Sequence, residues 1–276
     1  MADLDAVIDT GKPKRNLTGY PIIEKLKIYA NLLAVPVALV VLWHILAASG
    51  LLLEIVLPGP VRVVQGFLVI FKDGSLAKDL GVSALRVVKG YFWGVVIGLA
   101  IGVFCGLSKF MERLVAPLVD AIRQVPMMAW IPLIILWFGI GETSKTIIIA
   151  KSVFVPIFLN TFTGIRGVPK EYIEVAEVME FGYLKLLFRL VLPSALPNIF
   201  TGLRLGAGFS WMAVVAAEML GGLTGLGYAL LRARDFLESD KLIALMIVIG
   251  IVGLILDRVL RLIEGRILHW RKAYDG

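Results

Sequence analysis

A charged island interrupts the long apolar runs of this sequence: Glu171-Tyr172-Ile173-Glu174-Val175-Ala176-Glu177-Val178-Met179-Glu180-Phe181-Gly182. Ten residues further on, the chain reads Leu192-Pro193 and returns to apolar sequence. A protein in a lipid bilayer keeps such charges in water, because ionisable side chains are costly in the hydrocarbon layer. The contrast between the island and its flanks predicts a membrane protein with a water-exposed segment that another molecule can touch.

The composition supports a membrane-embedded chain. Of the 276 residues, 59% are hydrophobic and 18% are charged, which is too apolar for a soluble globular domain. A helix needs about 20 largely apolar residues to span the hydrocarbon layer, so the length allows about six spans and little else. An energy-converting domain would therefore sit on another chain. The net charge of +7 comes from basic residues beside apolar runs, which argues against a nucleic-acid partner.

We expect about six helical spans, since a chain in lipid must satisfy its backbone hydrogen bonds within helices or closed barrels. Continuous apolarity argues against barrel strands, whose residues would alternate. The expected spans lie near Leu32–Leu53, Val87–Leu107, Leu114–Phe138, Thr146–Thr163, Leu196–Leu220 and Leu242–Ile263. The expected organisation is a tail over residues 1–29 and one all-helical transmembrane domain over residues 30–276, with a water-exposed loop at about residues 165–195.

Glycines line one side of the second expected span. They recur at every fourth position as Gly94, Gly98, Gly102 and Gly106. Such a smooth face lets a neighbouring backbone approach closely, which is how helices pack in lipid. Simple packing is one interpretation, and a surface that slides during transport is the other. Glycines at the start of the fifth expected span repeat the theme: Gly202, Gly206 and Gly208.

Basic residues set the expected orientation. They are more numerous on the segments that lie inside when the N-terminus is cytoplasmic, which places both termini and the charged island in the cytoplasm. The exception is the first external connection, Glu54 to Lys89, which is also rich in basic residues. We interpret its segments Val61–Phe71 and Leu76–Lys89 as amphipathic helices near the membrane interface.

The island itself predicts a short amphipathic helix. Pro169 suits the first helical position, where its missing N–H would have been unpaired anyway. The helix would carry an apolar stripe of Tyr172, Val175, Ala176 and Met179. Its other side would be acidic, with Glu171, Glu174, Glu177 and Glu180. Gly182 and Pro193 then mark the return to the membrane.

The pattern Glu174-x-Ala176 followed by Leu190-x-Leu192-Pro193 resembles the cytoplasmic EAA loop of permease subunits in bacterial ATP-binding-cassette importers. The resemblance implies a coupling helix seated in a groove of the ATPase subunit. It implies that the coupling residues are Tyr172, Glu174, Val175, Ala176, Met179, Gly182 and Pro193. The sequence departs from the family at Glu180, where glycine is usual, and this departure would displace the turn that follows the helix.

Further segments narrow the resemblance to permeases for nitrate, bicarbonate, taurine and aliphatic sulfonates. They are Leu57-Pro58-Gly59-Pro60, Ser83-Ala84-Leu85-Arg86-Val87, Ala129-Trp130-Ile131-Pro132-Leu133, Trp137-Phe138-Gly139-Ile140-Gly141, Pro156-Ile157-Phe158-Leu159-Asn160-Thr161, Thr201-Gly202-Leu203-Arg204 and Ala216-Ala217-Glu218-Met219-Leu220. Each is weak alone, but in this order they cover most of the chain from Leu57 to Trp270. The last segment, from Arg234 onward, favours the taurine and sulfonate members.

The resemblance also implies an assembly. The chain would adopt the type I importer permease fold and pair with a second copy in the bacterial inner membrane. Two ATP-binding-cassette ATPase subunits and an extracytoplasmic solute-binding protein would complete the importer. ATP and Mg would bind to the ATPase partners, and no cofactor is expected on this chain.

Ionisable and aromatic residues within the spans are candidates for the translocation pathway: Arg123, Trp130, Arg204, Trp211 and Glu218. Structural alternatives stand beside each of them. Arg123 would also pair with Asp120, and Arg204 with a carboxylate of another helix. Glu218 is more typical of an ion pair or a gate than of an anion ligand, and tryptophans also anchor at membrane interfaces. Lys151 has no counterpart in the family at that depth and no role in this interpretation.

The sequence offers no catalytic or metal-binding pattern. His44 and His269 lack metal-ligand spacing, and no GxxxxGK[ST] loop is present to bind ATP. The glycine-rich run Gly221 to Gly227 is interpreted as a flexible external loop. Two functional alternatives remain beside the permease. One is a self-sufficient secondary transporter or channel, and the other is a membrane scaffold that docks an ATPase without moving a solute.

Overall fold

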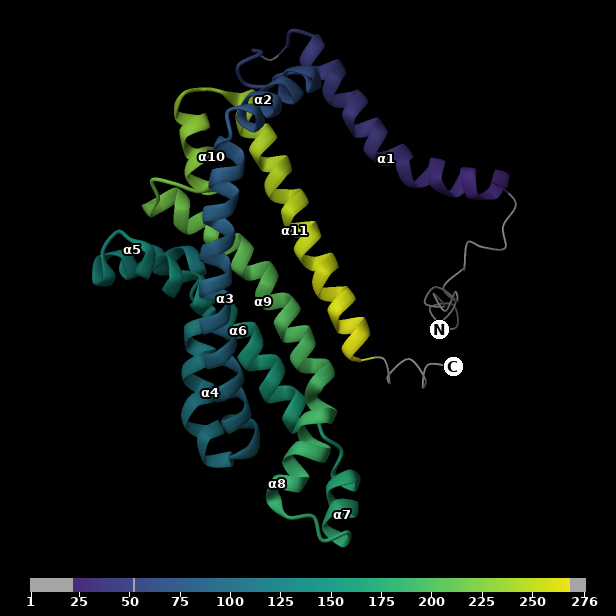
Figure 1. The fold of residues 1–276 in the computed structure, drawn as a ribbon, viewed down its shortest axis with the longest axis vertical. Helices are drawn as coiled ribbons and strands as arrows, with labels where there is room; N and C mark the ends of the chain where they lie inside the picture. Colours follow the sequence, from purple (N-terminus) through teal and green to yellow (C-terminus); the bar gives the residue numbers. More distant parts are fainter. Residues whose placement is uncertain (1–21, 52, 269–276) are drawn as a thin grey trace, which may run out of the picture. The chain divides into compact units, whose positions relative to one another are not determined.

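The computed structural model describes residues 22–51 and 53–268, with side chains from residue 34 onward. Within that part of the chain all regular structure is helical, which confirms the expected all-α fold (Figure 1). The helices are α1 Ile22–Ala48, α2 Pro60–Lys72, α3 Ser75–Leu107, α4 Lys109–Gln124, α5 Met127–Phe138, α6 Glu142–Arg166, α7 Lys170–Val178, α8 Tyr183–Leu186, a π-helical turn η2 Leu187–Val191, α9 Leu192–Gly221, α10 Leu226–Asp235 and α11 Ser239–Ile267.

The chain forms two compact units, residues 1–62 and 63–276. In the first unit, the indole N–H of Trp43 on α1 donates a hydrogen bond to the carbonyl of Pro58 at 3.1 Å. Arg62 forms an ion pair with Glu54 at 2.8 Å in the same unit. Residues 1–21 of the predicted tail lie outside the described residues. The second unit contains all of the remaining helices and the candidate site.

Four helical stretches are long and apolar enough to cross a membrane: α3, α6, the continuous run Tyr183–Gly221, and α11. The bent pair α4 and α5 makes a fifth if it counts as one span. The first expected span, Leu32–Leu53, falls on α1, whose described apolar stretch is Ala34–Ala48. These helices are those of a multi-pass membrane protein.

The third expected span, Leu114–Phe138, is broken and does not form one straight helix. Its two halves, α4 and α5, meet at an angle of 101°. The break falls at Val125, whose backbone is extended at φ −81° and ψ 118°. Pro126 follows, and proline disfavours the helical conformation in the residue before it. The continuous apolarity of the stretch predicted one straight span, but the dipeptide Val125-Pro126 bends it.

The external connection also differs from its prediction in one half. The helix expected at Val61–Phe71 is present as α2. The one expected at Leu76–Lys89 is not separate, because it forms the first turns of α3. That helix runs for 33 residues and contains no proline to end it after Lys89. Residues interpreted as lying at the interface are therefore carried into the helix bundle.

The glycine face of α3 packs against α6. A Cβ atom on Gly94 would lie 2.6 Å from the Cβ of Val153, and one on Gly98 would lie 3.0 Å from the Cβ of Ile157. Helix α6 is in turn close to α9, where a Cβ on Gly202 would lie 2.8 Å from that of Asn160. The packing interpretation of these glycines is confirmed. Gly208 takes no part in it, since nothing lies within 4 Å of its Cβ position.

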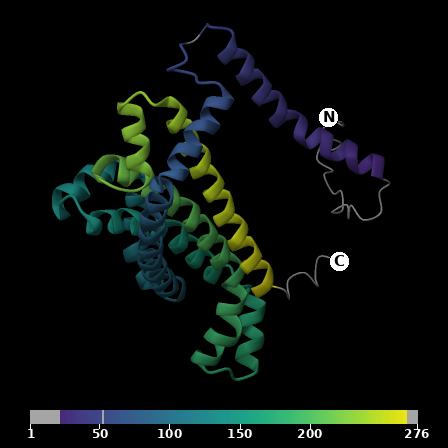
Figure 2. The ribbon, with the colours of Figure 1, turned by 45° about the horizontal axis from the view of Figure 1, so that its top comes forward.

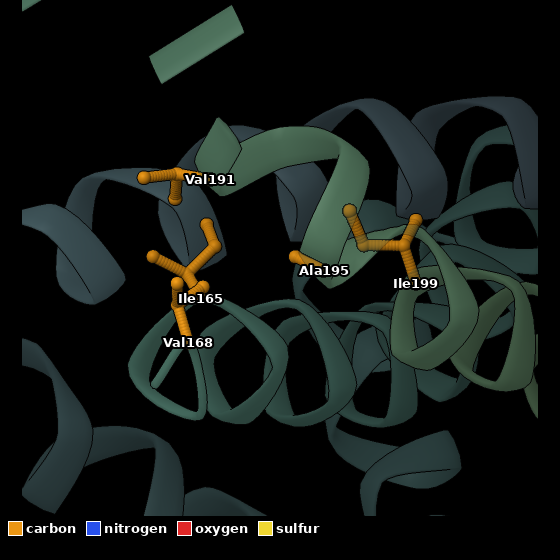
Figure 3. Packing of buried hydrophobic residues seen from close by; sticks show 5 residues of the cluster. All are labelled: Ile165, Val168, Val191, Ala195 and Ile199. Carbon is orange, nitrogen blue, oxygen red and sulfur yellow. The ribbon is translucent and has the colours of Figure 1, made fainter. Parts of the chain in front are cut away.

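A small apolar cluster joins the ends of α6 and α9 (Figure 3). Its buried members are Ile165, Val168, Val191, Ala195 and Ile199. Figures 1 and 2 place α7 and α8 at this end of the two long helices, with α10 at the opposite end. The short helix of the charged island packs against this cluster through Ile173.

Candidate coupling and translocation site

The charged island folds into α7 near the predicted start, but the helix begins at Lys170, and Pro169 is its N-cap and not the first helical residue. The N–H of Tyr172 donates to the carbonyl of Pro169 at 3.2 Å and closes the first turn. Ile173 packs against the apolar cluster at the ends of α6 and α9. Ala176, one turn later, is only 4% exposed. These two side chains attach α7 to the bundle.

The rest of α7 faces outward. Of the four residues in the predicted apolar stripe, only Ala176 is buried, while Tyr172, Val175 and Met179 are more than half exposed. Val178 is 85% exposed beside them. The acidic side chains are also exposed: Glu171, Glu174, Glu177 and Glu180. Contiguous exposed apolar groups at one end of a protein mark an interaction surface, and here exposed acidic residues of the same segment border them.

Helix α7 ends in a turn that places Glu180 in the left-handed region at φ 55°. The N–H of Phe181 donates to the carbonyl of Ala176 at 3.0 Å, and that of Glu180 donates to Glu177 at 2.9 Å. This hydrogen-bond pair is a Schellman C-cap, which usually carries glycine at the left-handed position. Gly182 has φ −62° and is not the left-handed residue. The turn therefore stays in place, and Glu180 itself adopts the glycine conformation.

The chain returns to the membrane through α8 and the π-helical turn η2, which run directly into α9. Pro193 stands near the first residue of α9, and it has no N–H to bond the carbonyl four residues earlier. The widened turn occupies that position. Tyr183, Leu184 and Phe188 are exposed here as well.

At the opposite end of the bundle, Glu218 is completely buried. The hydroxyl of Ser83 donates to its Oε1 at 2.8 Å, and the backbone N–H of Gly227 donates to its Oε2 at 2.9 Å. The guanidinium of Arg86 donates to Oε1 at 2.8 Å and forms a buried ion pair. The alternative role of Glu218 as an ion-pair residue is thereby realised.

Arg86 joins three elements at this end. Its Nε donates to the carboxylate of Glu142 on α6 at 2.9 Å, and its Nη1 donates to the carbonyl of Thr224 at 2.8 Å. Lys145 adds a second cation at 3.1 Å from Glu142. Sequence reasoning missed Arg86 and Ser83, because they lie in the segment assigned to the interface. The signal that points to them is Glu218, since a carboxylate within a span needs a cation from another helix.

The glycine-rich run after α9 is held in place, contrary to the flexible loop expected there. The N–H of Gly225 donates to Asp79 at 2.9 Å, and that of Leu226 donates to Ser83 at 3.0 Å. Gly225 has φ 103°, and a Cβ atom there would collide with the carboxylate of Glu218. The loop is therefore wrapped around the buried acid.

The other predicted pathway residues lie between the two ends. Arg123 pairs with Asp120 on its own helix at 2.9 Å. Arg204 on α9 pairs with Glu264 on α11 at 2.9 Å. Their structural alternatives are thus formed.

The two remaining predicted pathway residues are Trp130 and Trp211. The indole N–H of Trp211 donates to the carbonyl of Ile249 on α11 at 3.0 Å, so this residue also joins α9 to α11. The ring of Trp130 lies 4.6 Å from the ammonium group of Lys151 on α6. The structure thus brings Trp130 to Lys151, the residue for which the sequence suggested no role.

Comparisons with known proteins agree with this architecture. Residues 94–269 match the family described as binding-protein-dependent transport system inner membrane component. The taurine transport system permease protein TauC of Escherichia coli is 33% identical over 256 residues, covering 91% of this chain and 92% of TauC. The nitrate import permease protein NrtB of Synechocystis is 35% identical over 266 residues, with 93% and 95% covered. A Bacillus subtilis relative named for aliphatic sulfonates transport, SsuC, is 39% identical over 244 residues, with 88% of each covered.

Two solved structures share the fold. The MetNI methionine ABC transporter in inward-facing conformations superimposes with a TM-score of 0.53 at 20% identity, covering 65% of this chain and 91% of that one. An amino acid ABC transporter crystallised with histidines gives 0.57 at 18% identity, with 75% and 96% covered. At this identity the likeness concerns the fold alone, and it confirms the importer-permease fold expected from the sequence.

Proposed function

Since the chain belongs to the family of binding-protein-dependent transport system inner membrane components, in the branch of the sulfonate, taurine and nitrate permeases, we propose that it transports a small anionic or zwitterionic solute. The solute crosses the bacterial cytoplasmic membrane by ATP-driven alternating access. It is the membrane subunit of the importer, and separate ATPase subunits supply the energy. ATP and Mg bind on those subunits. This chain contributes the pathway and the mechanical link.

The observation that carries the proposal is the outward face of α7. Its apolar residues Tyr172, Val175 and Met179 lie in water beside acidic side chains, which suits a helix that seats in a groove of another protein. Its inward residues Ile173 and Ala176 rest on the cluster that joins α6 to α9. A movement of α7 is therefore passed to the ends of two spanning helices.

The assembly follows from this arrangement. A second copy of the chain forms the pathway with the first, and one ATPase subunit sits against each α7 on the cytoplasmic side. The end of the bundle that holds Glu218 and α10 then faces outward, where a solute-binding protein delivers the solute. ATP-driven closure of the ATPases draws the two α7 helices together and opens the pathway outward, and hydrolysis resets it.

The test is Glu174→Lys, which reverses an exposed charge on α7 and leaves the spans unchanged. We expect loss of ATPase co-purification and of solute-stimulated ATP hydrolysis in reconstituted vesicles, because the acidic border no longer matches its groove. Membrane insertion should be normal. Asp235→Lys is the matched control for docking, since it reverses an exposed charge on α10, away from α7, and should retain ATPase co-purification.

Normal stimulation by the Glu174→Lys protein would contradict the coupling role. Two other outcomes distinguish the alternatives. Solute uptake that persists in vesicles without any ATPase subunit would favour a secondary transporter or channel. ATPase binding without solute movement by the unmodified chain would favour a scaffold.

A further inference from the structure

Lys151 lies on the spanning helix α6. It stands nine residues after Glu142 on the spanning helix α6, which at 1.5 Å per residue places it roughly 14 Å along that helix. Among the described residues, no ion pair includes Lys151. Its ammonium group contacts the face of the Trp130 ring, with 4.6 Å between the nitrogen and the ring centroid. A ring face compensates only in part for the water that a partly buried cation loses.

A second cation faces the same hollow. A cavity of about 200 Å³ lies at the bend between α4 and α5, against α6 and α9, and both Arg123 and Lys151 line it. Its remaining wall is mainly apolar and includes Met127, Pro156 and Phe209. In the described part of the chain, no carboxylate side chain belongs to this wall. The hollow is therefore a partly open cationic pocket with an apolar surround at the bend between α4 and α5.

We propose that Arg123 and Lys151 together bind the oxyanion group of the transported solute in this cavity, with the apolar wall holding its short carbon chain. The planar guanidinium of Arg123 presents paired donors that match sulfonate or carboxylate oxygens, and Lys151 adds a compact positive charge. The indole N–H of Trp130, whose ring contacts Lys151, is buried and has no hydrogen-bond partner in the described structure. The site rests on the proposed function, and it assigns a role to a lysine that the family pattern leaves unexplained.

The contacts of Arg123 and Lys151 in the structure suit a site that binds an anionic solute and then releases it. Arg123 is held by Asp120 at 2.9 Å, and Lys151 is held by the Trp130 ring. An entering anion exchanges these contacts for its own, so its net affinity stays low. A pathway needs such moderate affinity, because a solute that binds too tightly does not leave. The cavity volume, equivalent to about six or seven waters in the liquid, suits a small solute.

The test uses the full-length permease in nanodiscs of phosphatidylcholine, titrated with methanesulfonate at constant ionic strength and followed by tryptophan fluorescence. We expect a saturable change, because an anion that draws Lys151 away alters the surroundings of the Trp130 ring. The change should vanish in Trp130→Phe. Lys151→Met should weaken the apparent affinity about ten-fold or more, the loss typical of one charge-assisted hydrogen bond. Lys151→Arg should retain binding.

Lys109→Met is the control, because it removes another cation of the same chain that does not line this cavity, and it should titrate as the unmodified protein. The proposal is overturned if no saturable change occurs or if Lys151→Met binds methanesulfonate with unaltered affinity. It is also overturned if added phosphatidylglycerol produces the change and methanesulfonate does not, since the cavity would then hold a lipid headgroup.

Failure of this site and failure of the proposed function give different results. The titration involves neither ATP nor an ATPase subunit, so it reports on the cavity alone. In complete reconstituted importers, Lys151→Met should lower the solute moved per ATP hydrolysed while ATPase docking persists. Glu174→Lys should abolish docking and leave the methanesulfonate titration unchanged.

Discussion

The two ends of the helix bundle differ in the burial of their acidic side chains. At the end that holds α10, Glu218 is fully buried and accepts hydrogen bonds from Ser83, Arg86 and Gly227. At the end that holds α7, the acidic side chains are exposed and lie beside exposed apolar residues. A charge whose partners are internal fixes the structure, whereas exposed apolar groups with an acidic border are available to another protein. The type of residue is the same at both ends, and burial distinguishes the roles.

This contrast follows from the cost of removing a charge from water. A buried ion costs several kcal/mol unless a partner and hydrogen bonds compensate it. The network around Glu218 supplies both and draws them from α3, α6 and the loop before α10. The glutamates of α7 remain in water and need no such compensation. Their removal should therefore affect assembly, whereas removal of Glu218 should affect folding.

The largest expected effect comes from Glu218→Ala. It leaves the Ser83 hydroxyl and the Gly227 N–H without their acceptor and Arg86 with one carboxylate fewer. Breaking a buried pair in this way costs about 3–5 kcal/mol. Denaturant unfolding in detergent measures it. Glu177→Ala on the exposed face of α7 is the control and should change stability by less than about 0.5 kcal/mol. Equal losses in the two variants would break the comparison between the ends.

The two ends also differ in how far the sequence predicts them. The start of α7 next to Pro169 followed from proline geometry, but the predicted apolar stripe is exposed except at Ala176. The glycine face of α3 followed from a four-residue repeat. The network of Arg86 did not, because Arg86 and Glu218 stand 132 residues apart and hydropathy does not distinguish a buried pair from an interfacial charge. Long-range pairing of this kind depends on the tertiary fold.

The region around Arg123 and Lys151 was predicted from the sequence less fully than α7 and more fully than the Arg86 network. Arg123 was recognisable as a charge within a span, but its place at a 101° bend depends on how Val125 and Pro126 end α4. That bend brings the end of α4 beside Lys151 on α6, and the resulting cavity is not visible in the order of residues. Sequence patterns identified the ionisable side chains here, and only the structure shows which of them share a cavity.

A smaller effect is expected in the packing that connects the two ends. Gly94→Ala would place a methyl group 2.6 Å from the Cβ of Val153 and 2.7 Å from the carbonyl oxygen of Ala150, so α3 and α6 must separate. Overpacking of this kind costs about 1–3 kcal/mol. Gly81→Ala, in the same helix, meets nothing within 4 Å and should be neutral or stabilising by up to about 1 kcal/mol. Thermal unfolding of both proteins measures the difference. A neutral Gly94→Ala would show that the two helices separate easily, as the sliding interpretation requires.

The smallest expected effect sharpens the comparison at α7 itself. Glu180 holds a left-handed conformation at φ 55°, which costs a residue with a side chain about 1–2 kcal/mol. Glu180→Gly should relieve most of that cost and slow amide hydrogen exchange at the C-cap N–H groups of Glu180 and Phe181.

Gly182→Ala is the matched control, because Gly182 has φ −62° and open space around its Cβ position, so alanine fits there without strain. If Glu180→Gly leaves exchange unchanged or speeds it, the conformation of Glu180 is not strained and the two ends differ in burial alone. If exchange slows, the C-cap of α7 carries a conformational strain that has no counterpart in the buried network around Glu218. The glycine that the resemblance places at position 180 then has a conformational reason, and the glutamate in this chain trades helix stability for one more charge on the docking face.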